Sequence, residues 1–219
     1  KYGTASAWPR IVACPASVAL PQSNPDVASE AAARGTAIHA FLESVANGTP
    51  VEEAIAATPA EYRATVEQIP VDDLQLDSIA AEVTFAMLPD GSAREIGRGL
   101  DRDYSAAGPD SIVGTADVVG LVGDAVYVAD YKTGRARQVP AGDHWQLRIL
   151  AAMAADAYST DEAIVEIIQI GQAGEIFRDR ATLDAFDLAA IRKTVRETCV
   201  KIDEMRKMER DEIEVREGD

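Results

Sequence analysis

The chain has 219 residues, of which 47% are hydrophobic and 26% are charged, and its formal net charge is −16 at pH 7. This apolar fraction excludes a disordered chain, and the length is enough for one large domain or two small ones with a buried core. The negative charge argues against a protein that coats nucleic acid through a basic surface. It does not exclude an enzyme whose metal ions neutralise phosphate locally.

Cysteine content and hydropathy limit the possible cofactors and the expected cell compartment. Cys14 and Cys199 are the only cysteines, which is too few for a tetrathiolate zinc or iron–sulfur site. The absence of a disulfide framework suits a reducing cytoplasm. No apolar run approaches the length of a transmembrane helix, and no basic-then-apolar signal segment precedes the first acid. We therefore expect a cytoplasmic protein without a membrane partner.

The first third of the chain predicts mainly helices. Residues 4–21 indicate one or two short helices broken at Pro9 and Pro15. Residues 51–57 and 60–68 indicate two more short helices, the second with a proline at its start.

Between these segments, residues 30–47 predict a longer helix. Ser29 is placed to cap it, and Gly48 is placed to end it. Two stripes on this helix have helical spacing: an apolar one of Ile38, Phe41, Leu42 and Val45, and a flanking one of Gly35, His39 and Glu43.

Residues 79–88 predict a strand, and residues 89–109 are rich in Gly, Asp, Ser and Pro. The latter segment is either a loop or a loop that contains a short strand around residues 96–100. In the strand, alternation predicts Ile79, Ala81, Val83 and Phe85 on one face and Glu82 and Thr84 on the other.

The centre of the chain predicts a β-hairpin. Residues 112–121 and 125–131 are rich in Val, Ile and Tyr, and Gly123-Asp124 between them supplies the turn. The position of this turn sets the register, which decides which side chains face each other across the two strands.

In that register Asp117 lies opposite Asp130, with β-carbons about 5 Å apart, and Lys132 shares the face of Asp130. Two carboxylates so close repel, so one of them must bind a proton or a cation must lie between them. A divalent metal bridges both, and Mg²⁺ is typically held by one or two carboxylates with phosphate oxygens and water. The alternative is a solvated hairpin edge whose acids splay apart, since a slip of one residue moves a side chain to the other face.

The remainder of the chain predicts a loop at residues 133–142, a helix that Asp143 caps and that extends to residue 158, and a buried strand at residues 163–170. A long helix follows from about residue 183, with an apolar stripe of Leu188, Ile191, Val195, Cys199, Ile202 and Met205. The last residues, 206–219, are almost all charged, and we expect them to fray.

This order of elements predicts a mixed α/β fold, with the hairpin at the centre of the sheet and helices on its faces. We expect one domain over residues 1–219. Its expected parts are N-terminal helices (1–28), a core (29–170) with a helical insert (50–76), a long C-terminal helix (182–210) and a frayed tail (211–219).

Several short motifs follow one another along the chain: RIVACPASVAL, RGTAIHAFLE, GTAD and ADYKTG, ahead of a helix that opens with Gln-Leu. Together they resemble the PD-(D/E)XK nuclease superfamily, and within it the RecB-like exonuclease branch, especially its small phage-encoded members. The resemblance covers the beginning and the core of the chain. It implies a single nuclease domain with a restriction-endonuclease-like fold, in which the hairpin of a mixed central sheet carries the catalytic site.

The resemblance assigns the central roles to three hairpin residues. Asp117 takes the place of the first acid, and Asp130 and Lys132 form the Asp-x-Lys pair. The two carboxylates would hold Mg²⁺, and the ammonium would stabilise the charge that develops on the phosphate. The alternative for Lys132 is a simple ion pair with Asp130.

The resemblance also implies roles outside the hairpin. Glu82 matches an additional catalytic acid and metal ligand, and His39 matches a helix histidine that approaches the metal. Gln146 matches the catalytic glutamine of the helix, and the backbone carbonyl of Tyr131 would be a further ligand. Leu150 departs from the pattern, because many relatives carry a tyrosine there.

These residues also have structural alternatives. Glu82 is otherwise a solvated strand residue, and His39 is otherwise a helix histidine paired with Glu43. Gln146 lies three residues after Asp143, which makes the two a candidate capping box.

The expected cofactor is Mg²⁺, with Mn²⁺ as a substitute. Oxygen ligands favour these ions over zinc, and a nitrogen ligand from His39 makes Mn²⁺ more acceptable. Arg34, Arg135 and Arg137 are candidate contacts to DNA phosphates, or equally surface charge. Cys14 matches the first of four cysteines that hold an iron–sulfur cluster in some relatives. The other thiolates needed are lacking, so we expect no cluster and a packing role for Cys14.

Two hypotheses on function follow. The first is a Mg²⁺-dependent nuclease, more specifically an exonuclease on linear duplex or single-stranded DNA ends in phage or bacterial recombination or repair, with a recombination protein as partner and oligomers known among relatives. The second is a binding module that keeps the nuclease fold without its activity, which the net charge of −16 motivates. An RNA-directed or structure-specific nuclease is a third reading, which phosphate contacts do not distinguish.

Overall fold

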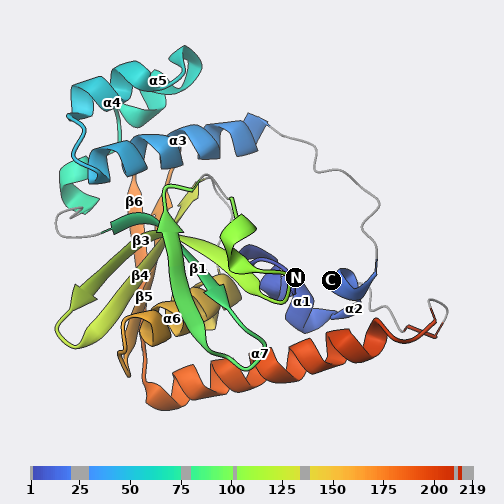
Figure 1. Cartoon of the computed structure of the whole chain (residues 1–219). Helices are drawn as coiled ribbons and strands as arrows, with labels where there is room; N and C mark the ends of the chain where they lie inside the picture. Colours follow the sequence, from blue (N-terminus) through green and yellow to red (C-terminus); the bar gives the residue numbers. More distant parts are fainter. Residues whose placement is uncertain are drawn as a thin grey trace.

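The computed structural model describes residues 2–20, 30–74, 80–100, 103–133, 139–209 and 212–213. Within these residues a six-stranded mixed sheet forms, in the order β2-β1-β3-β4-β5-β6 (Figure 1). Strands β4 and β5 are parallel, and the other neighbours are antiparallel. The strands are β1 (Ala80–Met87), β2 (Ala93–Arg98), β3 (Ile112–Val122), β4 (Ala125–Thr133), β5 (Ala163–Ile170) and β6 (Ile176–Leu183).

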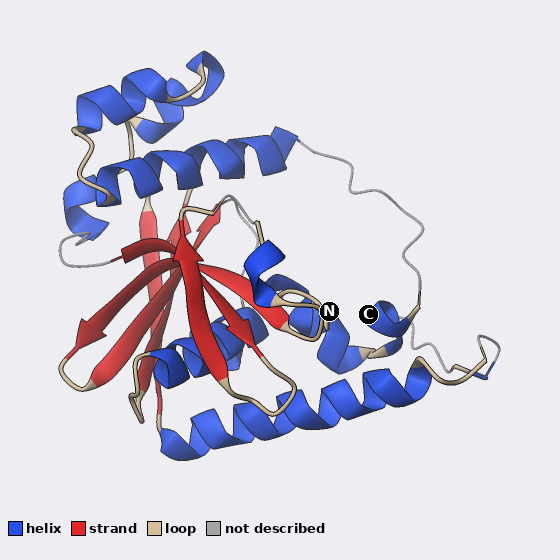
Figure 2. Cartoon of the chain, viewed as in Figure 1, coloured by secondary structure: helices blue, strands red, loops and turns tan. Residues whose placement is uncertain are grey.

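Helices form a layer on each side of the sheet (Figure 2). One layer consists of α3 (Glu30–Ala46) with α4 (Val51–Ala57) and α5 (Ala60–Val66) packed against it. The other layer consists of α6 (Trp145–Ala157), α7 (Ala185–Met205) and the short helices η1 (Ala5–Ala7), α1 (Trp8–Ala13) and α2 (Ala16–Ala19). Further 3₁₀ turns are η2 (Val71–Leu74), η3 (Ser105–Ala107) and η4 (Ala141–Asp143).

The two layers enclose separate apolar cores. The larger core joins α6, α7 and the N-terminal helices to the sheet, with Trp8 and Leu150 fully buried. The second core lies under α3 and contains Tyr131 and Ile168 together with three buried residues of the predicted α3 stripe, Ile38, Phe41 and Leu42; Val45 packs at its margin. Each large apolar side chain buried in this way contributes about 1.5–3 kcal/mol, so α3 is anchored firmly above the central strands.

The hairpin has the predicted register. Pairing runs from Val122 with Ala125 at the turn to Val118 with Ala129. It ends there, one step before Asp117 and Asp130, so these two acids lie just beyond the paired part of the hairpin. Beyond this point β4 continues in register with β5, and the two hairpin strands separate.

The predicted fold class is confirmed: a mixed central sheet with a hairpin at its middle, flanked by helices. The two edge strands were harder to predict. Strand β2 lies at Ala93–Arg98, a few residues before the position that we considered. Strand β6 was missed, because its charged and mostly exposed residues lack the alternation of a half-buried strand.

The starts of three helices also differ from the predicted ones. Pro9 does not break a helix but lies in the first turn of α1, where its missing N–H costs nothing. Asp143 belongs to η4, and His144 occupies the N-cap position of α6, so the capping box predicted for Gln146 does not form. Helix α7 is capped by Asp184, in a capping box with Asp187. In its predicted stripe all residues except the half-buried Met205 are buried.

Some predictions concern residues outside the described ranges, namely the Ser29 cap, Ile79, Arg135, Arg137 and most of the expected tail. Among the described residues, no helix combines the length and the apolar character needed to cross a bilayer. Both cysteines are free thiols, and burial in the α7 stripe raises the pKa of Cys199 to about 12.

Candidate metal centre

Three side chains from different elements converge where the hairpin strands separate. His39 comes from α3, Glu82 from β1 and Asp117 from β3, and one ligand atom of each lies within 4.8 Å of the others. Imidazole nitrogen and carboxylate oxygen are ligands that Mn²⁺ accepts, and the two carboxylates alone suit Mg²⁺. The chemistry of this donor set therefore fits a divalent ion.

A local irregularity brings Glu82 and Asp117 into this group. Glu82 has φ of 49°, which is uncommon for a residue with a side chain. Pairing of β1 with β3 is regular on both sides of the two acids but does not include them. Such strain costs about 1–3 kcal/mol and is concentrated at functional sites.

The irregularity also breaks the alternation of both strands. Ala80 and Val83 pack against the same core although they are three residues apart, and so do Ala116 and Val119. The prediction that Ala81 shares the face of Val83 is therefore wrong. Because of this irregularity, the faces of Glu82 and Asp117 cannot be read from strand alternation. Both carboxylates reach the imidazole of His39 on α3.

His39 is held by two partners. Its Nδ1 lies 3.4 Å from Oδ1 of Asp117, and its Nε2 lies 3.1 Å from the carbonyl oxygen of Tyr131. Burial alone would lower the pKa of His39, but the hydrogen bond and charge of Asp117, with smaller contributions from Asp130 and Glu82, raise it to about 9. A protonated ring fits both contacts, because each nitrogen then carries a hydrogen that faces an acceptor oxygen.

A second group adjoins the first and is built from β4 and α6. Gln146 Nε2 donates to Oδ1 of Asp130 at 2.5 Å, and Lys132 Nζ donates to Oε1 of Gln146 at 3.0 Å. Lys132 Nζ also lies 2.5 Å from Oδ2 of Asp130 and forms an ion pair with it. Lys132 is therefore the ion-pair partner of Asp130, and Gln146 orients both groups instead of capping its helix.

Asp130 is almost fully buried, with 2% of its surface exposed. Burial and the charge of Asp117 raise its pKa, and Lys132 and His39 oppose this increase. The two acids thus act on each other electrostatically, although Asp130 does not belong to the group of three ligand atoms around Asp117.

The backbone of Tyr131 joins the two groups. Its N–H donates to Oδ2 of Asp117 at 2.6 Å, and its carbonyl oxygen faces His39. Among the described residues, its hydroxyl is buried without a hydrogen-bond partner. The carbonyl predicted as a metal ligand is therefore next to the three-residue group, where His39 now contacts it.

His144 lies beside this second group, and no motif in the sequence marks it. Burial and the ammonium charge of Lys132 lower the pKa of this residue. Its position directly before the Trp145-Gln146 start of α6 was the only signal available. Of the predicted phosphate contacts, Arg34 is described, and its Nη2 donates to the carbonyl oxygen of Gly171 at 3.4 Å.

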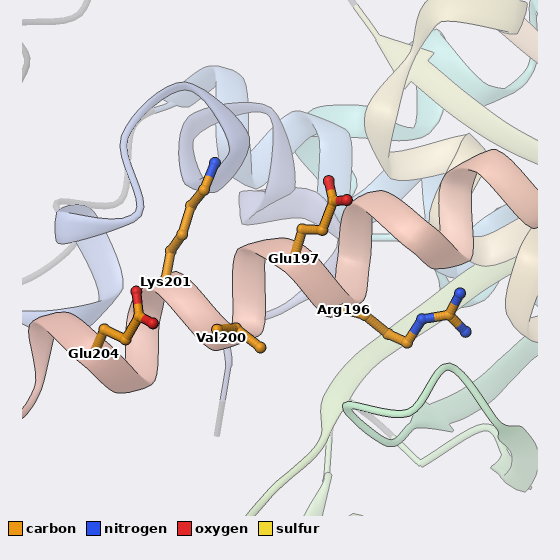
Figure 3. Close-up of a pocket in the computed structure, with 5 residues that line it drawn as sticks. All are labelled: Arg196, Glu197, Val200, Lys201 and Glu204. Atoms are coloured by element: carbon orange, nitrogen blue, oxygen red, sulfur yellow. The ribbon is translucent and has the colours of Figure 1, made fainter.

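A surface pocket lies elsewhere, along α7 (Figure 3). It is lined by Arg196, Glu197, Val200, Lys201 and Glu204. All of these belong to one helix, and none is part of the candidate metal centre.

The fold and this centre define a class: a mixed α/β domain that gathers acids, a lysine and a histidine at the open end of its central hairpin. The chain belongs to the family described as "Protein of unknown function (DUF2800)", whose model matches residues 3–172. This match includes the whole candidate centre and ends before β6 and α7.

Comparison with curated proteins gives no match. Among solved structures, the chain is similar to a candidate exonuclease from Eubacterium rectale, with 10% identity and a TM-score of 0.48 over 84% of this chain and 70% of that one. It is also similar to SSO0001, with 14% identity and a TM-score of 0.32 over 75% of this chain and 74% of that one.

Proposed function

We propose that this protein is a divalent-metal-dependent nuclease that hydrolyses phosphodiester bonds of DNA. The observation that carries the proposal is the convergence of His39, Glu82 and Asp117 within 4.8 Å, beside the buried Asp130 and its lysine partner. Acids, an imidazole and an ammonium at one point form a site for a hard cation and a phosphate together.

The ion proposed is Mg²⁺, with Mn²⁺ as a substitute. Asp117, Glu82 and Asp130 would hold it, with His39 and the Tyr131 carbonyl as further ligands. When bound, such an ion supplies positive charge to the scissile phosphate and a template for its orientation.

The chain's own residues have distinct tasks in this proposal. The Lys132 ammonium stabilises negative charge that develops on the phosphate, because it lies in a partly desolvated place where such a charge matters most. Gln146 keeps this ammonium and Asp130 in place through its two hydrogen bonds. His39 must release a proton before either nitrogen acts as a ligand, because only a neutral imidazole binds a metal.

The resemblance to the PD-(D/E)XK superfamily supports the finer part of the proposal. Asp117, Asp130, Lys132, Glu82 and Gln146 stand at its catalytic positions. We infer exonuclease action on linear DNA, in the manner of the RecB-like branch and in phage or bacterial recombination, with a recombination protein as partner.

The test is hydrolysis of end-labelled linear duplex DNA with Mg²⁺. We expect Lys132→Ala to lose about 100-fold in rate, the usual effect of removing one group that stabilises the transition state. Asp117→Asn should lose hydrolysis and metal binding together. Asp124→Asn is the matched control, since Asp124 is an exposed acid at the turn of the same hairpin. Equal rates in all four proteins would end the proposal.

A second candidate is a binding module with the same fold and no activity. It is favoured by one observation: His39 contacts both Asp117 and the Tyr131 carbonyl, two of the groups that a metal would bind. Calorimetric titration with Mn²⁺ separates the two candidates, because a binding module that lacks the centre should give no saturable heat near one equivalent of metal.

A further inference from the structure

A polar cluster on β4, β5 and β6 lies outside the proposed metal centre. Its centre is the carboxylate of Glu166, which is 2% exposed. Oε2 of Glu166 accepts hydrogen bonds from the hydroxyl of Tyr127 at 2.5 Å, from Arg178 Nη1 at 3.1 Å and from Arg180 Nη2 at 3.2 Å. The Arg180 guanidinium also lies over the ring of Tyr127, 5.5 Å from its centroid.

The cluster has more positive than negative charge. Burial and Glu166 raise the pKa of Tyr127 above its ordinary value, so this tyrosine is neutral and one carboxylate faces two guanidiniums. A buried ion pair is a weak source of stability, because desolvation offsets much of the attraction. A second role is therefore reasonable: the buried acid fixes the orientation of two arginines whose side chains are 29% and 54% exposed.

The sheet register places these arginines near the proposed metal centre. Ile168 pairs with Tyr131 on one side and with Arg178 on the other. Directly paired residues share a face of the sheet, and neighbouring strands are about 4.8 Å apart, so Arg178 lies about 10 Å across the sheet from Tyr131. The charges of Asp117 and Arg178 both act on the buried Tyr131 phenol, whose pKa burial raises.

A third arginine extends the arrangement. Arg34 contacts the carbonyl of Gly171, directly after the end of β5, and belongs to the same helix as His39. From the end of β5 toward its start, Arg34, Arg178 and Arg180 therefore lie at Gly171, Ile168 and Glu166. Arg34 comes from α3 and the other two arginines come from β6, so the three lie along the length of β5. With the carboxylates of Glu166 and of Glu175, which adjoins Gly171, the group has one positive charge more than negative, in a chain of net charge −16.

We propose that Arg34, Arg178 and Arg180 form a phosphate-binding row that holds the backbone of a polynucleotide strand as it reaches the metal centre, with Glu166 and Tyr127 as positioning residues. This inference rests on the proposed nuclease function. The guanidiniums of Arg178 and Arg180 converge on one oxygen of Glu166, so they lie side by side and face the same stretch of the strand's backbone, while Arg34 contacts a phosphate further along. The guanidinium fork suits phosphate oxygens, and such contacts do not depend on base sequence.

The test measures binding of a fluorescent single-stranded oligonucleotide by the full chain at several salt concentrations. Ca²⁺ replaces Mg²⁺, and the length of the oligonucleotide is checked after each titration. We expect Arg180→Gln to weaken binding about 3–10-fold at low salt, and to reduce the slope of log Kd against log salt by about 0.7, the value for one phosphate contact on a single strand.

The sheet provides a matched control at its opposite edge. Arg98 on β2 is also 54% exposed and also pairs with a glutamate, Glu95. Arg98→Gln should therefore leave affinity and slope at the wild-type values. Equal effects of the two substitutions, or no saturable binding by the wild type, would overturn the row.

Two more variants distinguish a positioning role of Glu166 from its effect on charge, and a lost phosphate contact of Arg180 from a loss of structure. Arg180→Lys keeps the charge and should keep the slope, which guards against a general loss of structure in Arg180→Gln. Glu166→Gln makes the row more positive, so a purely electrostatic attraction would tighten binding. A positioning role predicts weaker binding instead, and tighter binding would contradict it.

The outcome is separable from that of the nuclease proposal. Hydrolysis with Mg²⁺ is measured on the same proteins in a separate assay. Oligonucleotide binding through the row without hydrolysis would end the nuclease proposal alone. If DNA is hydrolysed but Arg180→Gln leaves the slope of log Kd against log salt unchanged, the phosphate-binding row is contradicted and the nuclease proposal is not.

Discussion

At the scale of single residues, the peptide of Tyr131 is the connection on which the candidate centre depends. Its N–H fixes Asp117, and its carbonyl fixes His39. The side chains on either side of it, Asp130 and Lys132, form the second group with Gln146. An acid and a lysine separated by one residue thus place two side chains on one face and one peptide between the two groups.

The protonated state of His39 leads to a prediction on stability without metal. Its pKa is raised from 6.5 to about 9 in the folded chain, so its contribution is fully present below pH 6.5 and is lost as the pH rises through 9. We expect the free energy of unfolding, measured with urea and a chelator, to fall by about 1–3 kcal/mol over this range. His39→Asn should remove this decrease.

His144 is the internal control, because it is the other histidine of the chain. The pKa of His144 is lowered, so this residue changes the free energy of unfolding only at pH values below 6.5. His144→Asn should therefore keep the decrease in the free energy of unfolding between pH 6.5 and 9. The same slope in wild type and His39→Asn would contradict the assignment of the proton to His39.

At the scale of elements, β1 and β3 show which features a local pattern predicts and which it does not. Their apolar residues predict strands correctly, because alternation is a local property of the sequence. The positive φ of Glu82 does not follow from this alternation. The hairpin register makes Asp117 a candidate and the family resemblance adds Glu82, whereas no local pattern predicts the break in both strands.

The strain at Glu82 can be measured. Gly adopts a positive φ without penalty, so Glu82→Gly should be more stable than Glu82→Ala by about 1 kcal/mol. In an ordinary strand position the order is reversed, and Ala81→Gly on the same strand should be destabilising by about 0.5–1 kcal/mol. Thermal or urea unfolding of the three variants checks this, and a more stable alanine variant at position 82 would contradict the strain.

At the scale of the whole molecule, the sheet separates two helical layers with two cores. The candidate centre depends on both layers, since His39 comes from α3 and Gln146 from α6. The sequence-based expectation of a single domain stays a proposal, and it has a direct consequence for unfolding.

A single domain should unfold in one transition. Trp8 and Trp145 are the only tryptophans and both report on the larger core, whereas far-ultraviolet circular dichroism reports on all helices. We expect the two signals to give the same midpoint in urea. Separate midpoints would indicate that the α3 layer unfolds independently.

By itself the sequence determined the central hairpin with its register, the buried helices and strands, and the residue types of the candidate centre. The hairpin, helices and strands follow from short-range regularities of period 2 and 3.6 and from turn chemistry. The hairpin register also gives Asp117, Asp130 and Lys132, whereas His39, Glu82 and Gln146 are implied only by the family resemblance. Only the tertiary structure decided that Asp117 and Asp130 belong to two adjoining groups, that Gln146 serves those groups and not its helix cap, and that β6 completes the sheet. These features depend on how β4 pairs with β5 and how α3 lies on the sheet. Such contacts join residues far apart in the chain, so no local pattern encodes them.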